Sequence, residues 1–164
     1  MTRSERETFL AGVHVGVVSI ERAGKPPLTV PIWYDFDPAI GVWLITSRAS
    51  EKGQALTKAS RFALCAQSEA PPLYQYVSVE GPVISVRPAL REEDLRPMAR
   101  RYFGRELGDR YADTTANEGS LVFTMRPERW RTVDYGKHPQ RPPMTNAPGL
   151  NIEDRFRICA CHWR

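Results

Sequence analysis

The stretch GVWLITSRASEKGQAL, residues 41–56, decides the fold, because it changes from one kind of secondary structure to another. Its apolar run at residues 42–45 has the composition of a strand. Ser50 suits the N-cap of a helix that begins near Glu51, since its hydroxyl can accept a hydrogen bond from a first-turn amide. The stretch therefore predicts a strand, a polar turn and a helix in direct succession.

The polar turn in this stretch has the composition of a phosphate-binding site. A helix N-terminus offers unpaired backbone amides and the favourable end of the helix dipole to an anion. Thr46, Ser47 and Ser50 add hydroxyl groups, and Arg48 and Lys52 add two cations. Basic turns at helix starts are also common on ordinary protein surfaces, so spacing alone leaves a solvated surface helix as an equal alternative.

The composition is that of a soluble globular domain. With 164 residues, 41% of them hydrophobic and 26% charged, the chain is long enough to bury one core. Its net charge of +4 comes from scattered basic residues, which favours an anionic small molecule over nucleic acid. No apolar run approaches the roughly 20 residues of a membrane span, and residues 1–7 precede no signal-peptide core. The three cysteines form no disulfide framework, so we expect a cytoplasmic protein without membrane association.

Hydrophobic periodicity predicts strands with helices inserted between them. The expected helices are residues 2–10, 51–60, 89–103 and 107–114, and the expected strands are 13–21, 28–36, 42–46, 62–68, 74–87 and 120–125, the last extended by 129–133. Residues 23–27 form a turn, and Gly81-Pro82 marks a bulge or kink in the long strand. About six strands, mostly in hairpin order, suit a closed or nearly closed antiparallel barrel. We therefore predict a mainly β, α+β domain over residues 1–135 and a proline-rich tail over 136–164.

Five motifs follow one another along the chain in an order that is more specific than any one of them. They are PIWY at residues 31–34, WLITSR at 43–48 with Lys52 soon after, RFALC at 61–65, YVSVEG at 76–81 and RPERW at 126–130. This order resembles the pyridoxamine 5'-phosphate oxidase-like, flavin-binding split barrels, including their deazaflavin-dependent relatives. The resemblance extends over roughly residues 9–135 and implies a split antiparallel β-barrel of the FMN-binding type.

The resemblance also implies a function and a set of site residues. Members of that family are homodimers with two cofactor sites at the subunit interface, and they transfer hydride to or from a small organic substrate. By resemblance, Thr46, Ser47, Arg48 and Lys52 would hold the cofactor phosphate. The backbone around Val30, Pro31, Ile32 and Trp33 would lie along the ring of the cofactor. Residues Gln75, Tyr76 and Val77, and Trp130 beside Arg129, would approach from the other subunit or from the substrate side.

The residues agree with a cofactor-dependent enzyme. A flavin brings its own redox chemistry, so the protein need only bind, orient and tune it, and no catalytic triad or pair of carboxylates stands out. Arg48 can meet a phosphate with two parallel donors, and Lys52 adds a point charge. The cofactor is FMN or, as the alternative, coenzyme F-420, whose longer anionic tail would favour extra basic residues. Lys58 and Arg61 are candidates for that role, but both also suit solvated helix-end charges.

Two other functions remain open at this stage: a non-catalytic flavin or deazaflavin carrier on the same barrel, and a small barrel that binds nucleic acid. The second would need basic and aromatic residues alternating on one strand face, which the sequence lacks. His14 suits a strand histidine better than a catalytic base, and Cys65 suits a small buried apolar residue. The cluster Cys159-Ala160-Cys161-His162 is spaced too tightly for the usual zinc patterns, so we predict no metal site.

Overall fold

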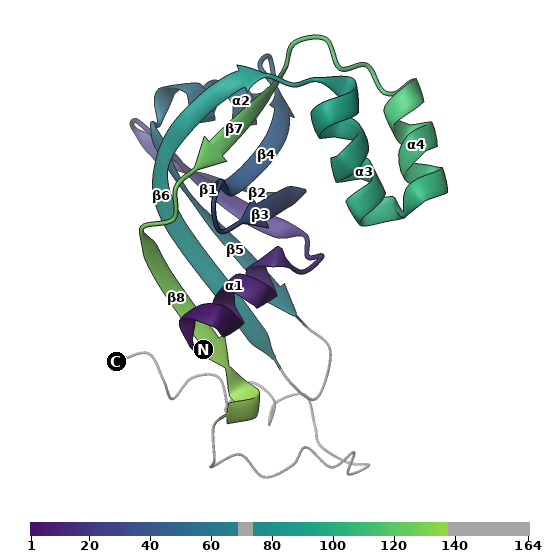
Figure 1. The fold of residues 1–164 in the computed structure, drawn as a ribbon. Coiled ribbons are helices and arrows are strands. Elements are labelled where there is room, and N and C mark those ends of the chain that lie inside the picture. Colours follow the sequence, from purple (N-terminus) through teal and green to yellow (C-terminus); the bar gives the residue numbers. More distant parts are fainter. Residues whose placement is uncertain (69–73, 138–164) are drawn as a thin grey trace, which may run out of the picture.

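The computed structural model describes residues 1–68 and 74–137 (Figure 1). Its helices are α1 (Arg3–Ala11), α2 (Glu51–Lys58), α3 (Arg96–Phe103) and α4 (Arg105–Thr114), with a π-helical turn at Arg91–Leu95 and a 3₁₀ turn at Tyr135–Lys137. Its strands are β1 (Gly16–Arg22), β2 (Lys25–Ile32), β3 (Tyr34–Asp37), β4 (Gly41–Ser47), β5 (Arg61–Ser68), β6 (Gln75–Pro88), β7 (Ser120–Met125) and β8 (Arg129–Asp134).

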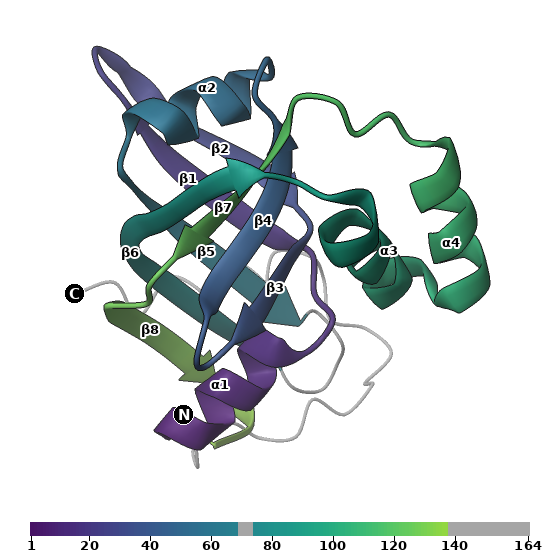
Figure 2. The same cartoon turned by 45° about the horizontal axis from the view of Figure 1, so that its top comes forward.

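The strands form one antiparallel sheet that curls into a split barrel (Figures 1 and 2). Their order is β2-β1-β5-β6-β7-β4-β3, and β8 pairs with β6 off this path. The two ends of that order, β2 and β3, are consecutive segments of chain joined at Trp33, so the chain itself continues from one edge to the other. The predicted mainly β, α+β split barrel is confirmed.

The barrel interior is filled by apolar side chains that alternate along the strands. Tyr34, Leu44 and Leu64 are completely buried, while their neighbours along each strand are half-buried. Helix α1 closes one end of the barrel and inserts Leu10, and α2 covers the opposite end (Figure 2). Helices α3 and α4 form a hairpin beside the barrel wall rather than over an end (Figure 2).

Strand β6 belongs to both halves of the barrel, and Gly81 is the point at which it turns from one to the other. Its first half pairs with β5 and β8, and its second half pairs with β7, with a register shift between Val83 and Ser85. A Cβ atom at Gly81 would lie 1.8 Å from the carbonyl oxygen of Arg126, so only glycine fits this crossing. The irregularity predicted at Gly81-Pro82 lies just beyond it, at Val83–Ser85.

Several predicted boundaries were wrong for identifiable reasons. The predicted strand 28–36 is two strands that separate at Trp33, and the predicted extension 129–133 is a strand of its own, β8, that pairs with β6. The described residues therefore contain eight strands rather than about six. The predicted turn at 23–27 is shorter, because β2 begins at Lys25. Pro26 and Pro27 are tolerated there because β2 pairs only with β1 and leaves its other side open.

The helical predictions also differ in detail. The predicted helix 89–103 starts as a π-helical turn, and regular α-helix begins only at Arg96, where Pro97 occupies the first turn and suits a new helix start. The predicted helices 51–60 and 107–114 run instead from Glu51 to Lys58 and from Arg105 to Thr114. In residues 1–68 and 74–137, no helix is long and apolar enough to cross a bilayer. The predicted tail lies outside the described residues except for its first two, Gly136 and Lys137.

Candidate functional site

The turn between β4 and α2 is held by its own hydroxyl groups; we call residues 46–53 the phosphate turn. The Ser50 hydroxyl donates to the carbonyl oxygen of Ser47 at 2.7 Å and accepts the Gly53 amide at 3.1 Å. The Thr46 hydroxyl, which is buried, lies 3.0 Å from the same Ser50 oxygen. The predicted N-cap role of Ser50 is confirmed. The hydroxyls of Thr46 and Ser50 therefore fix the shape of the turn, while Ser47 is exposed.

Gly53 allows α2 to begin directly against the end of β4. A Cβ atom at this position would lie 2.2 Å from the carbonyl oxygen of Ser47, far inside van der Waals contact. Backbone and side chain thus specify the turn together, since Gly53 permits the close approach and Ser50 closes the hydrogen bonds. The first-turn amides of a helix have no intrahelical acceptor, so this compact turn presents donors to an anion.

Two cations flank the phosphate turn without a carboxylate partner. Arg48 is exposed and Lys52 is half-buried, and neither takes part in an ion pair within residues 1–68 and 74–137. The Arg48 amide donates to the carbonyl oxygen of Gly119 at 2.8 Å, which fixes its backbone against the loop before β7. By contrast, Arg61 pairs with Glu128 at 2.8 Å. The charge of Arg48 and Lys52 is therefore available to a ligand, whereas that of Arg61 is already compensated.

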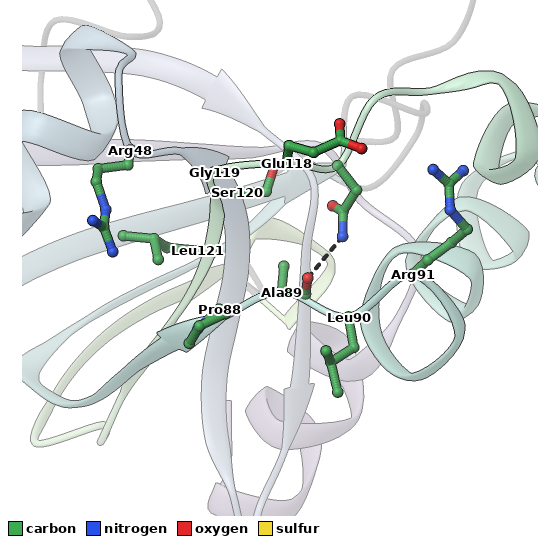
Figure 3. A pocket seen from close by; sticks show the side chains of 10 residues that line it. Arg48, Pro88, Ala89, Leu90, Arg91, Glu118, Gly119, Ser120 and Leu121 are labelled. Atoms are coloured by element: carbon green, nitrogen blue, oxygen red, sulfur yellow. Dashed lines mark hydrogen bonds between the residues drawn. The ribbon is translucent and has the colours of Figure 1, made fainter.

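Two hollows lie beside the phosphate turn. The first, which we call the charged groove, has a volume of 560 Å³ and carries Arg48 and Arg91 on opposite sides, with Glu118 at its rim (Figure 3). Asn117 crosses it and donates to the carbonyl oxygen of Ala89 at 2.7 Å. The remaining lining residues are Pro88, Leu90, Gly119, Ser120 and Leu121.

The second hollow, which we call the uncharged pocket, has a volume of 180 Å³. It lies between the barrel wall and the α3–α4 hairpin, and it shares Asn117 and Ser120 with the charged groove. Its barrel side is made by Trp33, Ile45, Thr46 and Ser47, and its hairpin side by Leu95, Met98, Tyr111, Thr115 and Ala116. None of these side chains is acidic or basic.

The structure brings part of the predicted site together. Trp33, Thr46 and Ser47 line the uncharged pocket, and Arg48 lines the charged groove that adjoins it. Lys52 follows on the first turn of α2. Val30, Pro31 and Ile32 precede Trp33 on the edge strand β2, where Ile32 is buried, Val30 is half-buried and Pro31 is exposed.

Three predicted residues lie apart from this group within the chain. Gln75 and Tyr76 begin β6, where they pair with β5 and with β8. Trp130 packs edge-on against Phe36, with ring centroids 5.9 Å apart, and the Arg6 guanidinium lies 4.4 Å from the centre of its ring. These residues were expected to approach from a second subunit or from the substrate side, and that expectation stays a prediction.

The hairpin side of the uncharged pocket was not predicted. Leu95 and Met98 were assigned only to the apolar face of a helix, because periodicity shows that a face is buried but not what it covers. Trp33 was predicted as a site residue, but its contact with the hairpin was not. Its ring stacks on Tyr102 at 4.9 Å and meets Phe103 edge-on at 4.8 Å, and so joins hairpin to barrel.

Burial favours the neutral form of four ionisable side chains of the barrel and the hairpin. Burial raises the pKa of Tyr34 and of Tyr102, whose hydroxyl donates to the carbonyl oxygen of His14 at 2.7 Å. Burial lowers the pKa of His14, which stacks on Phe9, and raises the pKa of the Cys65 thiol. None of these groups lines either hollow. The described part of the chain also contains no group of His, Cys, Asp and Glu side chains that could hold a metal ion.

Comparison with known proteins gives a consistent result. The sequence model of the pyridoxamine 5'-phosphate oxidase family matches residues 3–134. No curated protein matches the chain in sequence. Among solved structures, a conserved hypothetical protein from Mycobacterium tuberculosis superimposes with a TM-score of 0.71 at 18% identity, covering 90% of this chain and 92% of that one.

Two further structures share the fold and differ in what they bind. An F-420 reductase has a TM-score of 0.56 at 19% identity and covers 76% of this chain and 94% of its own. HutZ, a haem storage protein from Vibrio cholerae, has a TM-score of 0.55 at 13% identity, and the match covers 79% of this chain and 92% of that one. At these identities the likeness establishes the fold alone.

Proposed function

This chain belongs to the pyridoxamine 5'-phosphate oxidase family, and on that basis we propose that it is an oxidoreductase that uses FMN or, as the alternative, coenzyme F-420. The phosphate turn carries the proposal. It combines a capped helix start, an exposed hydroxyl at Ser47 and two cations, Arg48 and Lys52, without ion-pair partners in the described chain. Uncompensated cations around preorganised amides suit a phosphomonoester dianion, which both cofactors share.

The rest of the cofactor has a natural path along the barrel. The chain from Val30 to Trp33 follows the unpaired edge of β2 and ends at the uncharged pocket, and a flat ring can lie along such an edge. We propose that a second copy of the chain covers the ring and supplies Gln75, Tyr76 and Trp130. A homodimer is supported by the observation that none of those three residues lines either hollow of its own chain.

The protein would bind, orient and shield, while the cofactor when bound supplies the hydride chemistry. Arg48 and Lys52 would hold the phosphate, and Trp33 and Ile45 would exclude water from the side of the pocket that faces the barrel. Neither hollow contains a histidine or a cysteine, and the charged groove has a single carboxylate at its rim. This scarcity of proton-transfer groups is also what keeps a non-catalytic flavin or deazaflavin carrier as the second candidate. The reducing cytoplasm is our proposed location, since Cys65 is a free thiol.

The test is a titration of the apoprotein with FMN and separately with F-420, in which tryptophan fluorescence reports binding.

Arg48→Ala combined with Lys52→Ala should raise the dissociation constant of the cofactor at least about a hundredfold, since each lost charged contact contributes about 1.5–3 kcal/mol. The matched control is Lys25→Ala combined with Arg105→Ala. It removes the same charge from two exposed residues outside both hollows and should leave the affinity unchanged.

Unchanged affinity in the Arg48 and Lys52 double variant would refute the phosphate site. Tight binding of one cofactor only would identify it, and binding of neither would favour a function other than flavin chemistry. Turnover of the loaded protein with a reduced cofactor and an electron acceptor separates an enzyme from a carrier.

A further inference from the structure

The uncharged pocket has a chemical character distinct from that of the charged groove beside it. Its walls are a tryptophan, four aliphatic or thioether side chains, a tyrosine and a set of hydroxyl and amide groups, with no acidic or basic side chain. A charged ligand group in such a space would lose its hydration without gaining a counter-ion, which is costly. The pocket therefore suits an uncharged group that is mostly apolar and can accept or donate one or two hydrogen bonds.

The pocket is also too small for a whole cofactor. At 180 Å³ it lies below the range of about 300–1,000 Å³ that is usual for drug-sized ligands. One ring-sized group fits, whereas a three-ring flavin with its side chain does not. The pocket therefore has room for one ring-sized part of a ligand but not for the whole cofactor.

An apolar stripe on the α3–α4 hairpin adjoins the pocket. Phe103 is the last residue of α3, Leu107 and Tyr111 lie one turn apart on α4, and the three are 43%, 56% and 37% exposed. Tyr111 belongs to both features, since it lines the pocket and its ring lies 5.5 Å from that of Phe103. Partly exposed large apolar side chains that continue from an apolar pocket mark a candidate binding surface.

The stripe is held rigidly in place. Arg96 on α3 pairs with Asp109 and Asp113 on α4, and Arg100 pairs with Asp109 at 2.6 Å. The two helices touch at Gly108, where a Cβ atom would lie 2.6 Å from the backbone of Arg100. The ion pairs occupy the polar side of the hairpin, so the apolar stripe is a fixed surface rather than a frayed helix end.

We propose that the uncharged pocket and the stripe together form the substrate site, and that the substrate is an uncharged hydrophobic molecule. One ring of it enters between Trp33 and Met98, and the remainder lies along Tyr111, Leu107 and Phe103. This inference rests on the proposed function for its chemistry, since the substrate ring would lie next to the cofactor. It adds the class of substrate and the residues that select it.

The experiment uses the full chain and the uncharged fluorophore N-phenyl-1-naphthylamine, whose emission rises in apolar surroundings. Saturable binding is expected with and without cofactor. Thr115→Trp should fill the pocket and weaken binding about tenfold or more. Leu107→Ser removes only an exposed part of the stripe and should weaken it about threefold to tenfold. Ile40→Ser is the matched control, because Ile40 on the β3–β4 turn is 57% exposed and far from the pocket.

The outcomes separate this inference from the proposed function. Probe binding that is unaffected by both Thr115→Trp and Leu107→Ser, in protein that still binds cofactor, overturns the substrate site alone. Probe binding with the expected pattern in protein that binds neither FMN nor F-420 refutes the cofactor proposal and leaves the hydrophobic site standing. Molar mass from light scattering tests whether a second copy of the chain, and not a substrate, covers the stripe. If Leu107→Ser converts a dimer to a monomer without changing probe affinity, the stripe is a subunit interface and the inference is wrong.

Discussion

The phosphate turn and the α3–α4 hairpin lie on two sides of one pocket but are stabilised in different ways. The turn is closed by hydrogen bonds among the hydroxyls of Thr46 and Ser50 and the backbone of residues 47–53. It is linked to the rest of the chain by the Arg48 amide to Gly119, by Arg22 to Glu51 and by the pairing of β4 with β7. The hairpin depends on residues far away in sequence: Arg101 donates to the carbonyl oxygens of Ala11 and Gly12, and Tyr102 bonds to His14. Because the side-chain bonds that close the turn do not involve the hairpin, we expect substitutions in the hairpin to leave the turn intact, so the proposed cofactor and substrate sites should respond separately.

The largest effect that tests this comparison is expected from Gly53→Ala. The added methyl group would lie 2.2 Å from the Ser47 carbonyl oxygen, so α2 and the end of β4 must move apart. We expect the free energy of unfolding to fall by about 3 kcal/mol, or roughly 6–12 °C in melting temperature, and cofactor affinity to fall about tenfold or more. Thermal unfolding by circular dichroism and the cofactor titration measure the two effects.

Lys58→Ala is the control in the same helix. Lys58 is exposed and has no ion pair within the described residues, so Lys58→Ala should change neither the stability nor the affinity for FMN, which lacks the anionic tail of F-420, by a measurable amount. A Gly53→Ala protein with native stability and native cofactor affinity would mean that the turn is not rigid, and the contrast with the hairpin would be lost.

The second prediction concerns Asp94, which fastens the hairpin to the barrel. Its carboxylate receives two hydrogen bonds from Arg87 at 2.6 Å each, and one from the Leu90 amide at 2.8 Å. Burial acts to raise the pKa of Asp94, but these bonds outweigh it and hold the pKa below its usual value. Asp94→Asn should lower the free energy of unfolding by about 2 kcal/mol, because it weakens hydrogen bonds to a charged group.

If the two regions are independent, the effect of Asp94→Asn should be confined to the hairpin. Urea unfolding gives the stability change, and hydrogen exchange should report faster opening of α3 and α4 with little change at residues 46–53. Glu92→Gln is the control, since Glu92 pairs with Arg96 at an exposed position and should cost less than about 1 kcal/mol. Loss of cofactor affinity in Asp94→Asn would show that the turn depends on the hairpin after all.

The same contrast explains how much the sequence could predict. The strand, cap and helix of residues 41–56 were predicted correctly, because the signals for them are local: an apolar run, then Ser50, then a helical pattern. The barrel was predicted from strand count and order and from motifs arranged along the chain. The site residues near the turn followed from those motifs.

What could not be predicted depends on contacts between distant residues. Nothing near Trp33 in sequence shows that its ring stacks on Tyr102 and divides one predicted strand into β2 and β3. The uncharged pocket needs Ile45, Met98 and Tyr111 from three separate elements, and no local pattern brings them together. The hairpin's role in the site could therefore be seen only after folding.

The smallest predicted effect concerns His14, where the hairpin meets the barrel. Its ring stacks on Phe9 of α1, its carbonyl oxygen accepts the Tyr102 hydroxyl, and Arg101 of α3 lies close enough to act on its charge. Burial and then the Arg101 cation lower the pKa of His14 below 6.5. The unfolded chain therefore binds this proton first, so stability is unaffected above pH 6.5 and falls as the pH drops below it.

We expect the melting temperature of the native protein to decrease between about pH 7.5 and about pH 5.5, and the decrease to be smaller in His14→Gln. The chain has three histidines, and this substitution isolates the contribution of His14 from that of the other two. Probe binding measured over the same range should weaken in the native protein more than in His14→Gln, because a protonated His14 would repel Arg101 and loosen the hairpin. Identical pH profiles in the two proteins would mean that protonation of His14 does not affect the contact between hairpin and barrel, and that the acid-sensitive group lies elsewhere.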